Sequence, residues 1–191
     1  MSDVIIESER LLLRQFTLAD SKFIVQLVNS EGWLKYIGDR KIKTTGQAIN
    51  YIENVLIKGY QAYGYGFGLV ELKPNHHPIG LCGLIKRDYL PNIDIGFAFL
   101  SAYIGKGYGY EIAKKTLQFG FEQLQQEKIL AITLPSNRAS IKLLEKIGLR
   151  YEKTFVSKDT NEELFIYAIS NEGNAGKKKL SADFYNSHLF Y

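Results

Sequence analysis

The chain has 191 residues, of which 46% are apolar and 13% aromatic, and its formal net charge is +4 at pH 7. This length and composition suit one domain with a full core. The single cysteine, Cys82, excludes a disulfide within the chain. The small positive charge, with no basic stripe along any predicted helix, argues against nucleic-acid binding.

The sequence also argues against a membrane partner and a metal site. Its first residues lack the basic and then apolar order of a signal peptide, and no apolar run is long enough to span a bilayer. His76 and His77 lie in a polar turn without a further ligand at metal spacing. We therefore expect a cytoplasmic protein that holds no metal.

The first part of the chain predicts one strand and two helices. Residues 10–14 form the strand, and Thr17-Leu18-Ala19-Asp20 resembles a helix cap. Apolar residues at helical spacing follow as far as Val28. Residues 29–43 have no clear period and predict a loop or a broken helix. Thr44 begins the second helix, with an apolar stripe made of Ala48, Ile52, Val55 and Leu56.

The middle of the chain predicts three strands. Residues 66–72 and 79–86 are separated by a polar, proline-bearing turn and form a hairpin. Residues 92–100 alternate between two faces of a strand. One face carries Ile93, Ile95, Phe97 and Phe99, and the other carries Asn92, Asp94, Gly96 and Ala98.

A glycine-rich stretch, residues 105–111 (Gly-Lys-Gly-Tyr-Gly-Tyr-Glu), separates this strand from a helix predicted over residues 108–126. Glycine allows a tight turn whose N–H groups approach a ligand closely. The first N–H groups of a helix are unpaired and carry partial positive charge. The stretch therefore suits a phosphate or pyrophosphate, and a glycine turn without a ligand is the alternative.

The rest of the chain completes a domain over residues 1–170. We predict a buried strand at 129–134, a helix that ends at Gly148, and strands at 151–155 and 164–169. This mixture indicates α+β architecture around a mainly antiparallel sheet. Residues 171–191 form a basic, aromatic C-terminal tail, which we expect to pack on its own domain or on the second subunit of a possible homodimer.

Four segments resemble the GNAT acetyltransferase superfamily, and within it the Rim type, which includes enzymes acting on ribosomal-protein N-termini. In family order they are Glu9–Arg14 with Asp20, Ile79–Leu84, Asp94 through the glycine stretch to Glu111, and Asn137 to Leu149, within a match over roughly residues 5–170. The resemblance implies the acyl-CoA N-acyltransferase (GNAT) fold: a mixed, mostly antiparallel twisted sheet of about seven strands, splayed in the middle and flanked by about four helices.

The resemblance further implies that acetyl-CoA, as cosubstrate, lies between the fourth and fifth strands. Residues 92–100 would be the fourth strand, with a bulge near Gly96–Phe99 that leaves backbone groups for the pantetheine arm. Lys106 would add charge at the pyrophosphate or stay solvated. Asn137 would bond the pantetheine arm, cap its helix, or do both. The implied cofactor-binding residues are Phe97, Ala98, Phe99, Gly105, Lys106, Gly107, Tyr108, Gly109, Tyr110, Asn137, Ser140 and Lys146.

Acetyl transfer to an amine needs a base for the amine, a donor for the oxyanion and a proton or partner for the thiolate. We predict Asp94 as the base, the backbone N–H of Phe97 as the oxyanion donor and Ser140 as the acid. Ser140 takes this role because Leu144 stands where the superfamily often has a tyrosine. The alternatives are a solvated or structurally bonded Asp94 with waters carrying the proton, and a Ser140 that only caps or packs. Ile104 stands where the superfamily often has Gln or Arg.

Trp33, Tyr36 and Tyr65 are predicted to line the acceptor site, with buried core aromatics as the alternative. The family builds that site from the loop between its first two helices and from strand ends. We thus expect an N-acetyltransferase that moves an acetyl group from acetyl-CoA to a primary amine, on a protein N-terminus or a small molecule, by direct attack. A CoA-binding sensor or interaction module without turnover is the alternative.

Overall fold

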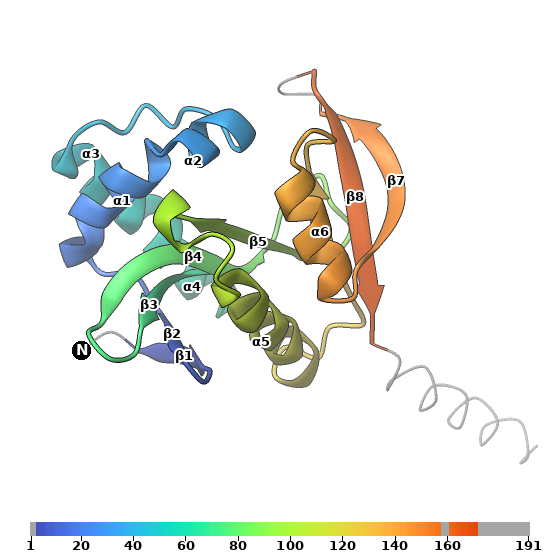
Figure 1. The fold of residues 1–191 in the computed structure, drawn as a ribbon, viewed down its shortest axis with the longest axis horizontal. Helices are drawn as coiled ribbons and strands as arrows, with labels where there is room; N and C mark the ends of the chain where they lie inside the picture. Colours follow the sequence, from blue (N-terminus) through green and yellow to red (C-terminus); the bar gives the residue numbers. More distant parts are fainter. Residues whose placement is uncertain (1–2, 158–160, 172–191) are drawn as a thin grey trace, which may run out of the picture.

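The structure is a computed structural model that describes residues 3–157 and 161–171. In this part of the chain, eight strands form one sheet in the order β1-β2-β3-β4-β5-β6-β8-β7 (Figure 1). The strands are β1 (Val4–Glu7), β2 (Leu11–Arg14), β3 (Phe67–Leu72), β4 (His77–Ile85), β5 (Asp94–Phe99), β6 (Lys128–Thr133), β7 (Arg150–Val156) and β8 (Glu163–Ser170). The α-helices are α1 (Ser21–Val28), α2 (Glu31–Tyr36), α3 (Thr45–Tyr51), α4 (Lys58–Tyr63), α5 (Tyr108–Glu122) and α6 (Arg138–Lys146). The predicted tail lies outside the described residues, apart from Asn171.

The N-terminal hairpin adds a strand that the sequence did not predict. Strand β1 pairs antiparallel with β2, and the Ser8 N–H donates to the Leu11 carbonyl at 3.0 Å across the turn. The sheet therefore has eight strands where about seven were expected. Strand β1 has four residues, of which only Ile6 is buried, so its sequence is too short to show a period.

The helix predicted after Thr44 is longer than its apolar stripe indicated. The Thr44 hydroxyl accepts from the Gln47 N–H at 3.3 Å, and the Gln47 side chain accepts from the Thr44 N–H at 3.1 Å, so a capping box starts the helix at the predicted residue. The chain continues from α3 through a π-helical segment, Ile52–Ile57, into α4, and it leaves the helix at Gly64 with φ +74°. Helix α2 occupies part of the stretch predicted as a loop or a broken helix.

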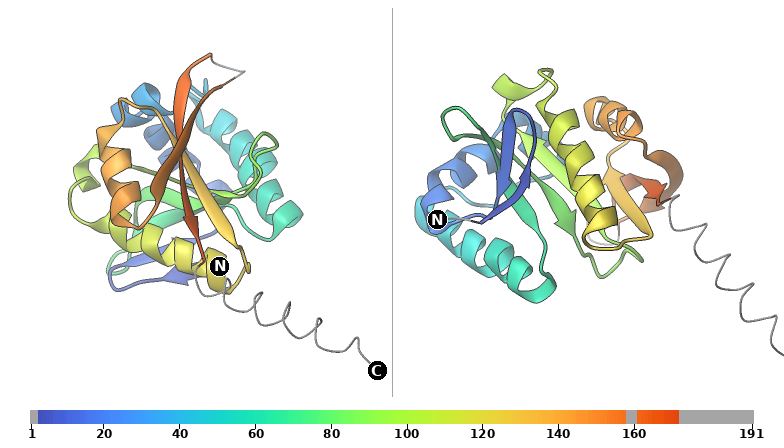
Figure 2. Two further views of the ribbon diagram at one scale, coloured as in Figure 1. Left: turned by 90° about the vertical axis from the view of Figure 1, so that its right-hand side faces the viewer. Right: turned by 90° about the horizontal axis from the view of Figure 1, so that it is seen from below.

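The helices cover the sheet on both faces (Figure 2). Helices α5 and α6 pack on one face, where they bury Ile112, Ala113, Leu117, Ile141, Leu144 and Ile147 against strand residues such as Leu13, Val70, Cys82 and Ile95. Helices α1, α2 and α3 bury the other face with Ile24, Leu27, Trp33, Ala48 and Ile52 against Leu69 and Leu81. The consecutive residues Leu69 and Val70 therefore face opposite layers, as the two-residue period of a strand requires.

The sheet divides between β5 and β6. These parallel strands share one partner pair, Asp94 with Leu130, beside a hydrogen bond of 2.9 Å from the Leu130 N–H to the Ile93 carbonyl. The predicted splay is present, and it falls after the fifth strand because β1 shifts the count by one. The bulge predicted near Gly96–Phe99 is wrong: β4 and β5 pair without a register shift from Gly80–Phe99 to Ile85–Asp94. Divergence from β6, and not a bulge, opens this edge of β5.

Glycines on β4 and β5 allow close approach to residues at the start of β3. A Cβ atom at Gly83 on β4 would lie 2.2 Å from the Gly66 carbonyl oxygen and 2.6 Å from Phe67 Cα. A Cβ atom at Gly96 on β5 would lie 2.8 Å from Cε1 of the Phe67 ring. The Gly83 contact is with backbone, so no rotamer change can relieve it.

We predict that Gly83→Ala lowers the free energy of unfolding by about 2 kcal/mol, because the added methyl group forces β3 and β4 apart. Urea denaturation followed by circular dichroism measures the change. Gly59→Ala is the matched control, since nothing lies within 4 Å of its Cβ position in α4. The control should raise the free energy of unfolding by up to about 1 kcal/mol. A Gly83→Ala protein as stable as the wild type would contradict the close approach.

Candidate active site

The glycine stretch forms a turn whose backbone N–H groups before Glu111 bond no other residue in the described part of the chain. Gly105 (φ +80°) and Gly107 (φ +84°) are left-handed, a conformation that glycine adopts without strain, and Gly107 is the N-cap of α5. The Ile104 N–H donates to the Ser101 carbonyl and the Glu111 N–H donates to the Gly107 carbonyl. Between them, no N–H group from Gly105 to Tyr110 donates to another described residue. The turn thus presents a row of donors at the positive end of a helix dipole.

Positive side chains flank the turn on both sides. Lys106 Nζ lies 5.4 Å from the centre of the Tyr103 ring, and Lys146 Nζ lies 4.7 Å from the centre of the Tyr110 ring. Both lysines are exposed. An anion bound by the turn would therefore meet positive charge from α6 as well as from the turn itself.

The free edge of β5 presents further unpaired backbone groups. The Leu100 N–H donates to Ile79 on β4, while the Ile93 carbonyl accepts from Leu130 on β6. Because backbone groups alternate between the two neighbours of a strand, those of Phe97 and Phe99 point toward β6. The ladder between β5 and β6 has already ended there, so these groups have no strand partner within the described part of the chain.

The turn, β5 and α6 converge at the first turn of α5. A Cβ atom at Gly109 would lie 3.2 Å from Leu143 Cδ2 of α6 and 3.4 Å from Phe99 Cε2 of β5. Residues from the three predicted cofactor-binding segments therefore lie side by side. A larger residue than glycine at position 109 would press on both neighbours.

Asn137 and Ser140 lie at the N-terminus of α6. The Asn137 Oδ1 atom accepts from the Ser140 N–H at 3.1 Å, so Asn137 caps the helix, as one of its two predicted roles requires. Ser140 is half-buried in the first turn of α6, and Leu144 one turn later is buried in the core. Contact of Asn137 or Ser140 with a cosubstrate stays a prediction.

Asp94 is buried, and the alternative of a solvated carboxylate is wrong. It is 1% exposed, and its two carboxylate oxygens accept from Arg87 Nε at 3.0 and 3.1 Å. Burial raises the pKa of Asp94 to about 6, although the charge and hydrogen bonds of Arg87 oppose the rise. Asp94 is also the residue of β5 that pairs with β6, through Leu130. It therefore lies at the closed end of the division, before the two strands diverge.

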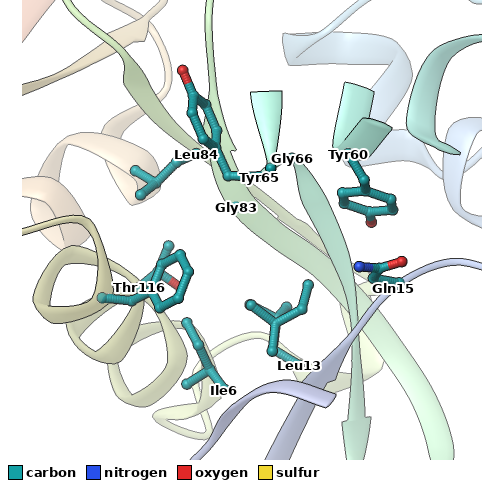
Figure 3. A pocket seen from close by; sticks show the side chains of 12 residues that line it. Ile6, Leu13, Gln15, Tyr60, Tyr65, Gly66, Gly83, Leu84 and Thr116 are labelled. Atoms are coloured by element: carbon teal, nitrogen blue, oxygen red, sulfur yellow. The ribbon is translucent and has the colours of Figure 1, made fainter. Parts of the chain in front are cut away.

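Two of the three predicted acceptor residues, Trp33 and Tyr36, lie on α2, and Tyr65 packs with a different core cluster. Trp33 is 5% exposed and belongs to one core cluster with residues of α1 and α3, which fits the core alternative, while Tyr36 is half-buried on α2. Tyr65 packs with the other face of the sheet and lines a cavity of about 30 Å³ between β1, β2, β4 and α5 (Figure 3). In Figure 3 the ring of Tyr65 points away from Leu13 and Thr116.

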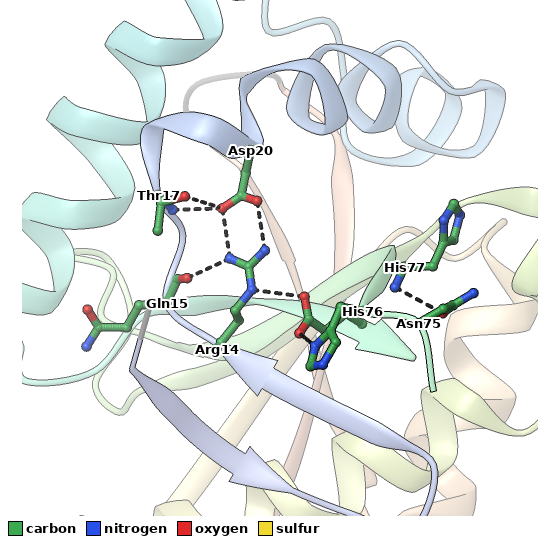
Figure 4. Close-up of polar contacts among 8 residues, drawn as sticks. Arg14, Gln15, Thr17, Asp20, Asn75, His76 and His77 are labelled. Carbon is green, nitrogen blue, oxygen red and sulfur yellow. Dashed lines mark hydrogen bonds and ion pairs between the residues drawn. The ribbon is translucent and has the colours of Figure 1, made fainter. Parts of the chain in front are cut away.

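A second group of charges, around Arg14, is paired internally (Figure 4). Arg14 donates to both Asp20 oxygens at 2.8 Å and to Glu71 at 2.9 Å, and His76 Nδ1 lies 2.7 Å from the other Glu71 oxygen. Burial raises the pKa of Asp20, but the hydrogen bonds from Arg14 and Thr17 outweigh burial and hold it below its ordinary value. A groove of about 430 Å³ passes over this cluster. Because the charges satisfy one another, we assign the cluster to joining β2, β3 and the start of α1.

Sequence reasoning missed the partners of two charged residues. Arg87 lies seven residues before Asp94, and no spacing rule indicates that pair. Arg10 and Ser8 both bond Glu111, which lies across the fold in the first turn of α5. Glu111 places a negative charge beside a turn that suits an anion, and such a charge requires a positively charged partner. That requirement was the signal that the sequence offered for the Glu111 pair.

Within the described residues, no group of three or more His, Cys, Asp or Glu side chains is placed to hold a metal ion. None of the helices described there has both the length and the apolar character needed to cross a membrane.

Comparison with known proteins identifies the family. A family profile described as an acetyltransferase (GNAT) domain matches residues 10–150. The uncharacterized N-acetyltransferase YnaD of Bacillus subtilis is 29% identical over 150 residues, covering 78% of this chain and 85% of YnaD. A GNAT-family acetyltransferase structure from Bacillus anthracis is 28% identical with a TM-score of 0.73, covering 86% of this chain and 97% of that one.

A more distant structure, RimL in complex with coenzyme A, shares the fold at 13% identity and a TM-score of 0.76, covering 88% of this chain and 98% of RimL. The divided sheet and the turn at α5 are thus parts of the GNAT fold. The chain belongs to the GNAT acetyltransferase family and is by class an N-acetyltransferase.

We predict that Arg87→Met destabilises the protein mainly at high pH. Loss of the guanidinium leaves the buried Asp94 carboxylate unpaired and raises its pKa further above about 6. A group whose pKa is higher in the folded than in the unfolded state supports folding while protonated, and this support is lost as the pH rises through the folded value. The free energy of unfolding should fall by about 2–3 kcal/mol at pH 8 and by less at pH 5.

Denaturant titrations at the two pH values measure this effect. The control is the double variant R87M/D94N compared with D94N. Neither protein has a carboxylate at position 94 to titrate, so the loss of stability caused by Arg87→Met in that background should be the same at both pH values. An equal loss for Arg87→Met at pH 5 and pH 8 would contradict the assignment.

Proposed function

We propose that this protein transfers an acetyl group from acetyl-CoA to a primary amine by direct attack of the amine on the thioester. The observation that carries the proposal is the row of unpaired N–H groups from Gly105 to Tyr110 beside the division of β5 from β6. Family membership supports the acetyl donor. The solved complex of RimL with coenzyme A supports it at the level of the fold.

In this proposal the cosubstrate extends from the turn to β5. The turn from Gly105 to Tyr110 binds the pyrophosphate, with Lys106 and Lys146 nearby. The amide groups of the pantetheine arm bond the free backbone edge at Phe97 and Phe99, as an added strand would. Asn137 contributes from the cap of α6. The thioester then lies between β5 and α6.

The chemistry follows from the same groups. The backbone N–H of Phe97 donates to the oxyanion that forms as the amine attacks. Asp94 accepts the proton of the ammonium group through water, because it lies three residues from Phe97 at the closed end of the division. The thiolate leaves unassisted, since a thiol pKa near ~8.5 makes it a fair leaving group, or takes a proton from Ser140.

The acceptor is a protein N-terminus or a small-molecule amine. Solved structures that share this fold include a ribosomal-protein-S5-alanine acetyltransferase from Vibrio fischeri, at 19% identity, and an aminoglycoside acetyltransferase, at 18%. These likenesses establish the fold alone and leave the two kinds of acceptor equal. The acceptor is therefore the variable to screen.

The test is a titration with CoA followed by a screen for release of free CoA. We expect calorimetry to detect CoA binding, and a thiol reagent to detect CoA released from acetyl-CoA with at least one amine. The panel comprises a peptide with a free N-terminus, a polyamine, an aminoglycoside and a small metabolite amine. Absence of CoA binding would overturn the proposal. Binding without release on any amine would favour a CoA-binding sensor instead.

We predict that Asp94→Asn lowers kcat about a hundredfold or more while the Kd for CoA stays within twofold, because the variant removes the base and leaves the turn proposed to bind CoA unchanged. In the wild type, kcat should rise as the pH increases through about 6, where Asp94 loses its proton. The variant should lose this dependence. Glu152→Gln, which removes an equal charge from a surface pair with Lys128, is the control and should resemble the wild type. An unchanged pH profile in Asp94→Asn would exclude Asp94 as the base.

A further inference from the structure

Glu111 in the first turn of α5 is bound by the N-terminal hairpin. Its Oε1 accepts from Ser8 Oγ at 2.8 Å and from the Arg10 N–H at 2.8 Å, and its Oε2 accepts from Arg10 Nε at 2.7 Å. Burial raises the pKa of Glu111, but these hydrogen bonds outweigh burial and hold it below its ordinary value. Glu111 is therefore a carboxylate at neutral pH, directly beside the turn.

The Arg10 side chain contacts three successive residues of the turn, Lys106, Gly107 and Tyr108. Its Nη1 donates to the Lys106 carbonyl at 3.3 Å, and its guanidinium carbon lies 4.5 Å from the centre of the Tyr108 ring. Its Nη2 lies 3.3 Å from the position that a Cβ atom of Gly107 would take. One side chain thus holds a carbonyl, fills the space beside a glycine and lies on an aromatic ring, all within the turn.

These contacts have two physical consequences for an anion at the turn. Glycines at positions 105 and 107 give the turn many accessible conformations, and the contacts of Arg10 select one in which the N–H groups from Gly105 to Tyr110 are unpaired. The carboxylate of Glu111 would repel a phosphate in the first turn of the helix, and the paired guanidinium cancels that charge.

We propose that Arg10 is a positioning residue for the phosphates of CoA: it holds the Gly105–Tyr110 turn in its anion-binding conformation and neutralises Glu111. This inference rests on the proposed function, because it takes the pyrophosphate to bind at the turn. Arg10 acts through the turn, so its effect is confined to donors that carry phosphates.

The test compares two acetyl donors, acetyl-CoA and S-acetylpantetheine, which has the same thioester arm without phosphates. For Arg10→Ala we expect the KM for acetyl-CoA to rise about tenfold or more, with kcat and the kinetics of S-acetylpantetheine unchanged. Arg10→Lys should recover part of the loss, because it keeps the charge but not the planar fork of donors. Arg150→Ala removes an equal charge from β7 and should leave both donors unaffected.

A second variant tests the charge separately. R10A/E111Q should bind CoA more tightly than R10A, since the unpaired carboxylate is gone. The proposal is overturned if R10A weakens both donors equally, if it weakens neither, or if R10A/E111Q binds no better than R10A. A failure of the proposed function is distinct, because the wild type itself would then not bind CoA or would not prefer acetyl-CoA to S-acetylpantetheine.

Discussion

The divergence of β5 and β6 after one shared pair is the constraint on which the rest of the site depends. Buried backbone N–H and C=O groups require partners, and β5 has lost those partners at Phe97 and Phe99 by the time the chain leaves the strand. The glycine turn follows within a few residues, and α6 begins close by. A single topological feature therefore brings three sets of exposed donors and acceptors to one place.

Two carboxylates, Asp94 and Glu111, each pair with an arginine, yet their pKa values shift in opposite directions. Asp94 is almost fully buried and has one guanidinium nitrogen within hydrogen-bond distance, so burial prevails and its pKa rises to about 6. Glu111 is less buried and accepts from a hydroxyl, a backbone N–H and a guanidinium, so its pKa falls. The depth of burial and the number of donors, and not the presence of an arginine alone, decide whether each pKa lies above or below its ordinary value. A group with a pKa near 6, such as Asp94, suits proton transfer, whereas a group that stays charged, such as Glu111, suits a lasting ion pair.

Local patterns predicted most of the fold and the turn. The β3–β4 hairpin, the alternation along β5, the glycines before α5 and the cap at Asn137 are all set by residues close in sequence. Strand β1 was missed because four residues show no period, and the predicted bulge was wrong because strand divergence leaves no trace in the sequence of one strand. The Arg10–Glu111 pair joins residues 101 positions apart, which no single-sequence pattern can indicate.

That long-range pair links the N-terminal hairpin directly to the glycine turn and the start of α5. Strand β1 is a sheet edge of four residues, the kind of element most readily peeled away or displaced by a fusion partner. Ser8 and Arg10 sit on the bend of this hairpin, so loosening the first strand would release Glu111 as well. Disruption of the first strand would then weaken binding of the proposed cosubstrate at the turn, although the turn is far along the sequence from the disrupted residues.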